Sequence, residues 1–230
     1  MKRIKKKELG IGIFLLATFS AVMIGIFMPL IDGENALNYL DNLYNSISKG
    51  SAYYIPKVEH LVEDHGSEAV TLSLTMQSAE AAANAERLFT RSGTTAKAEG
   101  TTLSVSGDLE AIFKTCLEDA ESAYHNREED LVARYGMQVR PVLHSWWLAL
   151  KAMEKELNRQ KLFSAAQLTH TVQAKTVECA YNYYGIEAQE IKNRWGTVLF
   201  SLVFYVIYTI WYGYGIMYVF EGLGFELAAH

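Results

Sequence analysis

The sequence predicts a mainly α membrane protein in which two transmembrane helices flank an extracytoplasmic α+β domain. Three observations predict this class. An uncharged apolar segment lies near each end of the 230-residue chain. The segment between them is long enough for one hydrophobic core, and its apolar residues switch between helical and strand spacing. Within it we expect a small β-α-β-β-α module followed by long helices.

The composition limits the classes of partner. Apolar residues make up 50% of the chain and charged residues 20%, with only three prolines, which is atypical of a disordered protein. The formal net charge is -5, and because basic residues cluster at the N-terminus, the middle of the chain is acidic. Contacts to phosphate supply most nucleic-acid affinity, so we expect no nucleic-acid partner.

The first apolar segment covers residues 10–31 and follows a basic N-terminus, residues 1–9. A helix needs about 20 apolar residues to cross a bilayer. The alternative is a secretory signal peptide, whose apolar region is shorter and ends in small residues at a cleavage site. This segment instead ends in Met28-Pro29-Leu30-Ile31, which favours an uncleaved signal anchor.

Residues 196–220 form the second uncharged span, and residues 221–230 a short tail. Tryptophan and tyrosine crowd the far half of this span, as they do at membrane interfaces. The N-terminal basic cluster predicts that both termini are cytoplasmic and that residues 32–195 lie outside the cytoplasm, in a two-pass protein of the cell (inner) membrane. Lys192 and Arg194 oppose this orientation weakly.

Both spans carry residues suited to helix packing. Ala17, Ala21 and Gly25 repeat every four residues, and small residues let another helix approach closely. Tyr205, Tyr208 and Tyr212 fall on one side of the second span, where a phenol hydroxyl requires a hydrogen-bond partner. Two alternatives follow: the spans pack on each other, or they pack on other membrane subunits.

The start of the outer domain predicts two helices. Asp32-Gly33 ends the first span, and apolar residues from Leu37 to Ile47 then recur at helical spacing until Gly50. A connection over 51–56 leads to a short helical stretch over 57–64.

Residues 68–123 predict the α+β module. Apolar residues alternate from Val70 to Met76, as in a half-buried strand, and Ser78 can cap an alanine-rich helix over 79–90. Residues 94–98 and 101–106 predict a hairpin, and Asp108 begins another amphipathic helix.

Residues 137–192 predict a helical hairpin. A wide apolar stripe runs from Val139 to Leu157, and a second long helix from about Ser164 toward Tyr184. Because nothing between Glu187 and Trp195 breaks a helix, we expect the last helix to continue into the second span as a rigid stalk.

Two groups of side chains are weak candidates for metal ligands. His60 and Glu63 share a helix face, and His125 and Glu129 lie on the face that also carries Glu121. Zinc sites use histidine and carboxylate, but neither group completes a known ligand pattern. We therefore expect solvated charged surfaces, no bound metal and no cofactor.

Other polar and aromatic side chains have structural alternatives. His144 is expected to be a hydrogen-bonded core residue, and Trp146 and Trp147 either core residues or a partner surface. Cys116 and Cys179 could form a disulfide outside the cytoplasm, or remain free buried thiols.

These observations favour protein binding over catalysis. The chain lacks a C-x-x-C pair, a G-x-S-x-G motif, a P-loop and a G-x-G-x-x-G motif. We therefore expect a non-catalytic accessory or assembly subunit of a membrane complex, with the lipid bilayer and other membrane subunits as partners. An extracytoplasmic sensor is the first alternative, although the tail is too short for an output domain, and a metal-dependent enzyme is the second.

Overall fold

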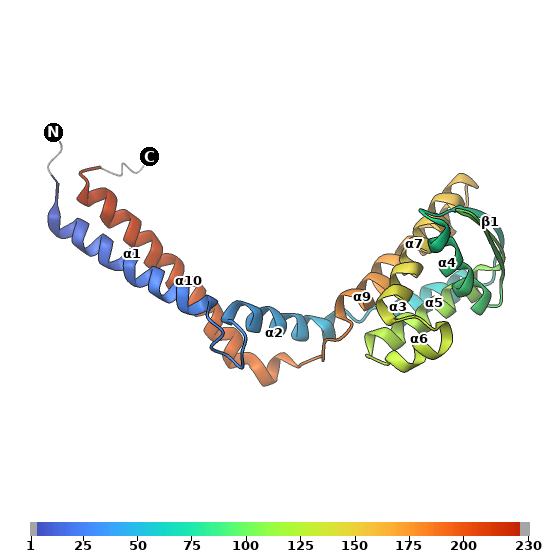
Figure 1. Ribbon diagram of the computed structural model, residues 1–230, viewed down its shortest axis with the longest axis horizontal. Coiled ribbons are helices and arrows are strands. Elements are labelled where there is room, and N and C mark those ends of the chain that lie inside the picture. The colour runs from blue at the N-terminus through green and yellow to red at the C-terminus, as the bar shows by residue number, and fades with distance from the viewer. Residues whose placement is uncertain (1–3, 226–230) are drawn as a thin grey trace. The chain divides into compact units, whose positions relative to one another are not determined.

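The computed structural model describes residues 4–225 and divides into two compact units (Figure 1). The first, here called the hairpin unit, contains residues up to Ser48 and from Ala188 onward. The second, the central unit, is Lys49–Glu187. Helices dominate both, and the central unit also contains a three-stranded sheet.

Two helices of the hairpin unit, α1 (Lys6–Phe27) and α10 (Ile191–Gly222), are each long and apolar enough to cross a membrane. In the most apolar 18-residue stretch of each helix, only 6% is buried inside the protein. A core helix of a soluble domain would be mostly buried. Helix α1 ends where Met28 becomes extended, since a residue that precedes proline avoids the helical conformation.

The two long helices lie side by side and antiparallel (Figure 1). The Lys5 amide donates to the Gly222 carbonyl at 2.9 Å, and the Phe19 ring stacks on Tyr208 with centroids 4.2 Å apart. Helix α2 (Ala36–Ser51) begins after Asn35, whose side chain accepts from the Asn38 amide. It joins α10 through a 2.6 Å hydrogen bond between the Tyr44 and Ser201 hydroxyls.

The central unit begins with α3 (Ile55–His65) and then contains the predicted β-α-β-β-α order. The elements are β1 (Ala69–Thr75), α4 (Ala79–Arg91), β2 (Thr95–Glu99), β3 (Thr102–Asp108) and α5 (Leu109–Tyr124). The sheet is antiparallel in the order β1-β3-β2. Ser78 caps α4 and Asp108 caps α5, and Gly100 takes the left-handed conformation that the β2–β3 turn requires.

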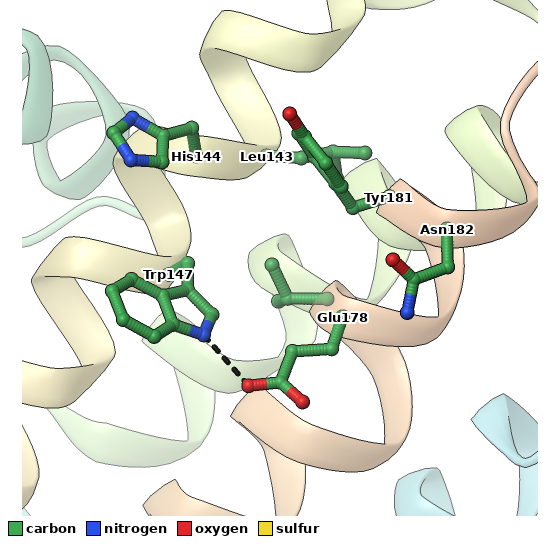
Figure 2. A pocket seen from close by; sticks show the side chains of 7 residues that line it. Leu143, His144, Trp147, Glu178, Tyr181 and Asn182 are labelled. Atoms are coloured by element: carbon green, nitrogen blue, oxygen red, sulfur yellow. Dashed lines mark hydrogen bonds between the residues drawn. The ribbon is translucent and has the colours of Figure 1, made fainter.

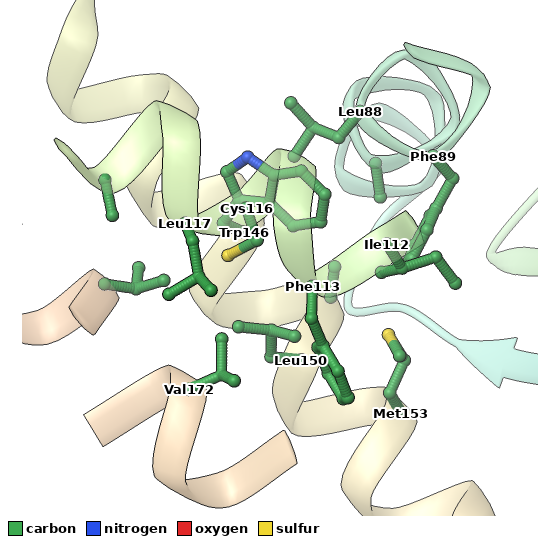
Figure 3. Close-up of a cluster of buried hydrophobic side chains, with 14 of the residues drawn as sticks. Leu88, Phe89, Ile112, Phe113, Cys116, Leu117, Trp146, Leu150, Met153 and Val172 are labelled. Atoms are coloured by element: carbon green, nitrogen blue, oxygen red, sulfur yellow. The ribbon is translucent and has the colours of Figure 1, made fainter. Parts of the chain in front are cut away.

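Helix α4 and helix α7 (Val139–Arg159) pack against the sheet. The other helices pack on α5 and α7: they are α6 (Glu128–Tyr135), α8 (Phe163–Val172) and α9 (Glu178–Tyr183), and a π-helical turn, η1 (Gln173–Val177), joins the last two. Strand side chains Leu72, Leu74 and Leu103 point into the core. Figure 3 shows how Phe113 on α5 and Phe89 on α4 gather beside Trp146 on α7.

The free edge of β1 is bonded by side chains from the end of α7. Gln160 donates to the Thr71 carbonyl at 2.9 Å, and the Glu156 carboxylate accepts from the Ser73 backbone amide. Two hydrogen bonds from Arg159, at 2.6 and 2.7 Å, hold this carboxylate and lower its pKa to about 2. These contacts bond backbone groups of the edge strand that would otherwise be free to pair with a strand of another chain.

The structure corrects the expected stalk. Helix α9 ends at Tyr183 and α10 begins at Ile191, so residues 184–190 interrupt the helix. Lys49 Nζ donates to the carbonyls of Tyr183 and Ile186, and the Asn126 side chain accepts from the Gly185 amide. Side chains distant in sequence thus bond the backbone groups that a continuous helix would use itself.

Candidate functional site

The contact between α1 and α10 is built on three glycines, here called the glycine seam: Gly12, Gly215 and Gly222. A Cβ atom at Gly12 would lie 2.6 Å from the Val219 backbone nitrogen, and one at Gly222 would lie 2.5 Å from the Leu9 nitrogen. At Gly215 the nearest atom belongs to the Leu16 side chain, at 2.7 Å. The helix backbones therefore touch at both Gly12 and Gly222, as small residues permit in membrane helices.

The predicted small-residue repeat lies on another face of α1. Ala17 and Ala21 are exposed, and a Cβ at Gly25 would meet nothing within 4 Å. At 100° per residue, these positions point about 180° away from Gly12. The structure therefore shows that α1 and α10 pack on each other, but not through this repeat.

The three predicted tyrosines divide between the contact and the exposed surface. Tyr208 donates to the Phe19 carbonyl at 3.3 Å, and the Tyr212 ring lies 5.1 Å from that of Phe19. Tyr205 is 68% exposed. Within residues 4–225, its hydroxyl has no hydrogen-bond partner.

The adjacent tryptophans have different environments. Trp146 is fully buried, and its indole donates to Asp119 at 2.8 Å, so it is a core residue and not a partner surface. Asp119 also accepts from Tyr135 at 2.5 Å and from Arg134 at 2.8 Å. Burial raises the pKa of Asp119, and these three donors oppose that rise.

Trp147 instead borders a surface groove between α7 and α9 (Figure 2). Its indole donates to Glu178 at 2.7 Å, and the His144 ring lies parallel to it at a centroid distance of 6.5 Å. His144 is exposed, so its expected place in the core is wrong. The groove has a volume of about 440 Å³ and is mainly apolar.

The candidate metal ligands do not assemble. His60 lies 3.3 Å from Glu63 on an exposed helix face. Helix α5 ends at Tyr124 and α6 starts at Glu128, so Glu129 does not share a helix with His125, which instead lies 3.0 Å from Glu121. In residues 4–225, no three histidine, cysteine or acidic side chains lie close enough together to hold an ion.

Both cysteines are free in the structure, so the disulfide considered from the sequence is not formed in it. Cys116 is buried in the core beside Leu117, and burial raises the pKa of its thiol well above the ordinary value. The Cys179 thiol donates to the Ala52 carbonyl at 2.9 Å. Each therefore behaves as a small buried side chain.

Comparison with known proteins adds no functional assignment. The chain matches no protein-family model, and no curated protein or solved structure is significantly similar to it.

Proposed function

We propose that this chain is a non-catalytic, two-pass accessory or assembly subunit of a membrane protein complex. In this proposal α1 is an uncleaved signal anchor, both termini are cytoplasmic, and residues 32–195 lie outside the cytoplasm. Partners bind the outward faces of the two spans and the central domain. Support comes from the basic N-terminus and from two apolar helices that pack on each other and leave most of their surface exposed.

The observation that carries the proposal is the exposed hydroxyl of Tyr205. With a rise of 1.5 Å per residue, this residue lies about 14 Å inside the span from Gly196, too deep for the phenol to reach the headgroup region. Water is not available there, and an unpaired hydroxyl in hydrocarbon is costly. Since no described group of this chain accepts from it, an acceptor on another membrane helix is the natural partner.

Other hydroxyls in the spans show how the chain satisfies such groups when it can. Thr18 and Ser20 on α1, and Thr209 on α10, each donate to a backbone carbonyl of their own helix. Tyr208 donates across to α1. Tyr205 differs because its phenol projects from the paired helices. The exposed face with Ala17 and Ala21 supplies a second surface that a partner helix could approach closely.

The test is purification from the native source in a mild detergent, with identification and quantification of co-purifying chains. We expect Tyr205→Phe, which removes only the hydroxyl, to lower recovery of the partner about threefold, the factor that corresponds to one interhelical hydrogen bond in a membrane. Tyr214→Phe is the matched control, because Tyr214 is also exposed but lies in the aromatic end of the span. A chain that purifies alone as a monomer would refute the proposal, as would equal recovery with both variants.

A sensor of an external ligand is a second candidate, favoured by the groove at Trp147. The interruption over residues 184–190 removes the rigid stalk that would transmit a signal most directly, which leaves this function second. The metal-enzyme alternative has no supporting group of ligands within the described part of the chain.

A further inference from the structure

The groove beside Trp147 is formed by α7 on one side and by η1 with α9 on the other (Figure 2). Leu143 and Val177 form its apolar floor and are buried. Around them stand the side chains that line the opening, which are His144, Trp147, Glu178, Tyr181 and Asn182. The volume, about 440 Å³, is within the range of small-molecule sites.

The π-helical turn explains why Glu178 and Tyr181 face this groove. One extra residue in a turn rotates everything after it by about 100° relative to a continuous α-helix. Gln173, at the start of the turn, donates to the Trp147 carbonyl at 3.0 Å, and Thr176 donates to the Val172 carbonyl. The Gln173 bond attaches the turn to α7, and the Thr176 bond lies within the turn's own helix.

The groove has an acidic and aromatic lining. Glu178 is the one acidic residue among the side chains that line it, and no lysine or arginine is among them. One Glu178 oxygen accepts from the Trp147 indole at 2.7 Å. No described donor bonds the second oxygen. Trp147 and Tyr181 add π faces, which attract positive charge.

Two cationic side chains of the protein lie over these aromatic rings. Lys151 Nζ lies 4.7 Å from the Trp147 ring centroid, and the Arg140 guanidinium lies 5.7 Å from that of Tyr181. Both cations are exposed, and neither has a carboxylate partner among the described residues. Neither residue is among those that line the groove.

We propose that this groove binds a small organic ammonium ion, held by the Glu178 carboxylate and by the rings of Trp147 and Tyr181. The ammonium contacts the carboxylate oxygen that the indole does not use, and its carbon substituents cover Leu143 and Val177. This inference is independent of the proposed subunit function, since it concerns a site within the central unit.

The experiment uses the full chain in maltoside micelles, because phosphocholine detergents and lipids carry an ammonium group themselves. Choline is titrated against tryptophan fluorescence, with its uncharged isostere 3,3-dimethyl-1-butanol as the ligand control and potassium chloride as the ionic-strength control. We expect a saturable response to choline in the millimolar range and none to the alcohol.

Three variants locate the response. Trp147→Phe should abolish the fluorescence change, because Trp147 is the tryptophan in the groove. Glu178→Gln retains an acceptor for the indole but removes the charge, and should weaken choline binding about tenfold, the factor expected for one hydrogen bond to a charged group. Tyr181→Ala should weaken it less, and circular dichroism verifies that each variant is folded.

A further ligand distinguishes the source of the ammonium group. Stronger binding of N-acetyl-lysine methylamide than of choline would assign the site to a lysine side chain of a partner protein, and the reverse to a free small molecule. Either result supports ammonium recognition. Equal responses to choline and the alcohol, no saturation with choline, or unchanged affinity in Glu178→Gln would overturn it.

Discussion

Replacement of Gly12 by alanine tests the packing of α1 against α10. The new Cβ atom would lie 2.6 Å from the Val219 nitrogen and 2.9 Å from the Tyr218 carbonyl carbon. Ordinary van der Waals contact begins near 3.4 Å, so the helix axes must separate by about 0.8 Å. Backbone atoms cannot rotate aside as a side chain can, and the expected cost of such overpacking is about 2 kcal/mol.

The matched control is Gly10→Ala on the same helix, where a Cβ would meet nothing within 4 Å. Both substitutions gain the same helix propensity, up to about 1 kcal/mol in favour of alanine. That term cancels in the comparison, so the difference between the two variants isolates the steric cost. Gly215→Ala should fall between them, because the Leu16 side chain at that position can move.

Cysteines replace Lys7 and Leu223, which lie at the same end of the α1–α10 pair. They are labelled with a donor and an acceptor fluorophore. The native Cys116 and Cys179 are replaced by alanine in every variant. Energy transfer is then followed as sodium dodecyl sulfate is added to maltoside micelles. We expect Gly12→Ala to separate the helices at a lower detergent fraction than Gly10→Ala. Identical titrations of these two variants would refute the close approach at Gly12.

Two further predictions concern the central unit. Asp119→Ala leaves the buried Trp146 indole and Tyr135 hydroxyl without their acceptor and breaks the ion pair with the partly exposed Arg134. It should lower the free energy of unfolding by about 3 kcal/mol in urea titrations followed by near-ultraviolet dichroism; an unchanged midpoint would contradict this. The pKa of Glu156 is lowered from 4.5 to about 2 in the folded chain, so its stabilising contribution is present above about pH 4.5 and is lost as the pH falls toward 2. Glu156→Gln should therefore destabilise the protein at pH 7 and have a smaller effect at pH 3, and an effect of equal size at both would exclude this titration.

Local patterns predicted most elements of the central unit because their causes are local. Alternating residues from Val70 to Met76 form β1, and Ser78 and Asp108 cap the helices that the sequence predicts after them. The predicted hairpin is shifted by about one residue, with its turn at Gly100-Thr101. Helix α6 was not predicted, since its eight residues carry only a short apolar pattern.

Features set by distant contacts could not be predicted in this way. The interruption before α10 depends on Lys49 and Asn126, which bond carbonyl and amide groups more than 50 residues away. The π-helical turn depends on the bond from Gln173 to α7. Without that turn in view, the sequence offered no reason to place Glu178 beside Trp147.

Two patterns in the sequence indicate buried or packed residues without showing which residues of the pattern make the contact. Successive helical residues point about 100° apart, so Trp146 in the centre of the α7 stripe is core while Trp147 at its border reaches the surface. The repeat of Ala17, Ala21 and Gly25 predicts a packing face on α1, but α10 does not contact this face. The contact with α10 instead uses Gly215 and Gly222, whose seven-residue spacing returns both to one side of the helix.

The most direct test of the proposed two-pass arrangement is the side of the membrane on which the central unit lies. A reporter that fluoresces only in the cytoplasm is inserted at the exposed β2–β3 turn, after Gly100, with an N-terminal fusion as the cytoplasmic control. We expect a fluorescent N-terminal fusion and a dark insertion, and alkaline phosphatase at Gly100 should be active. A fluorescent insertion with inactive phosphatase would contradict the proposed orientation.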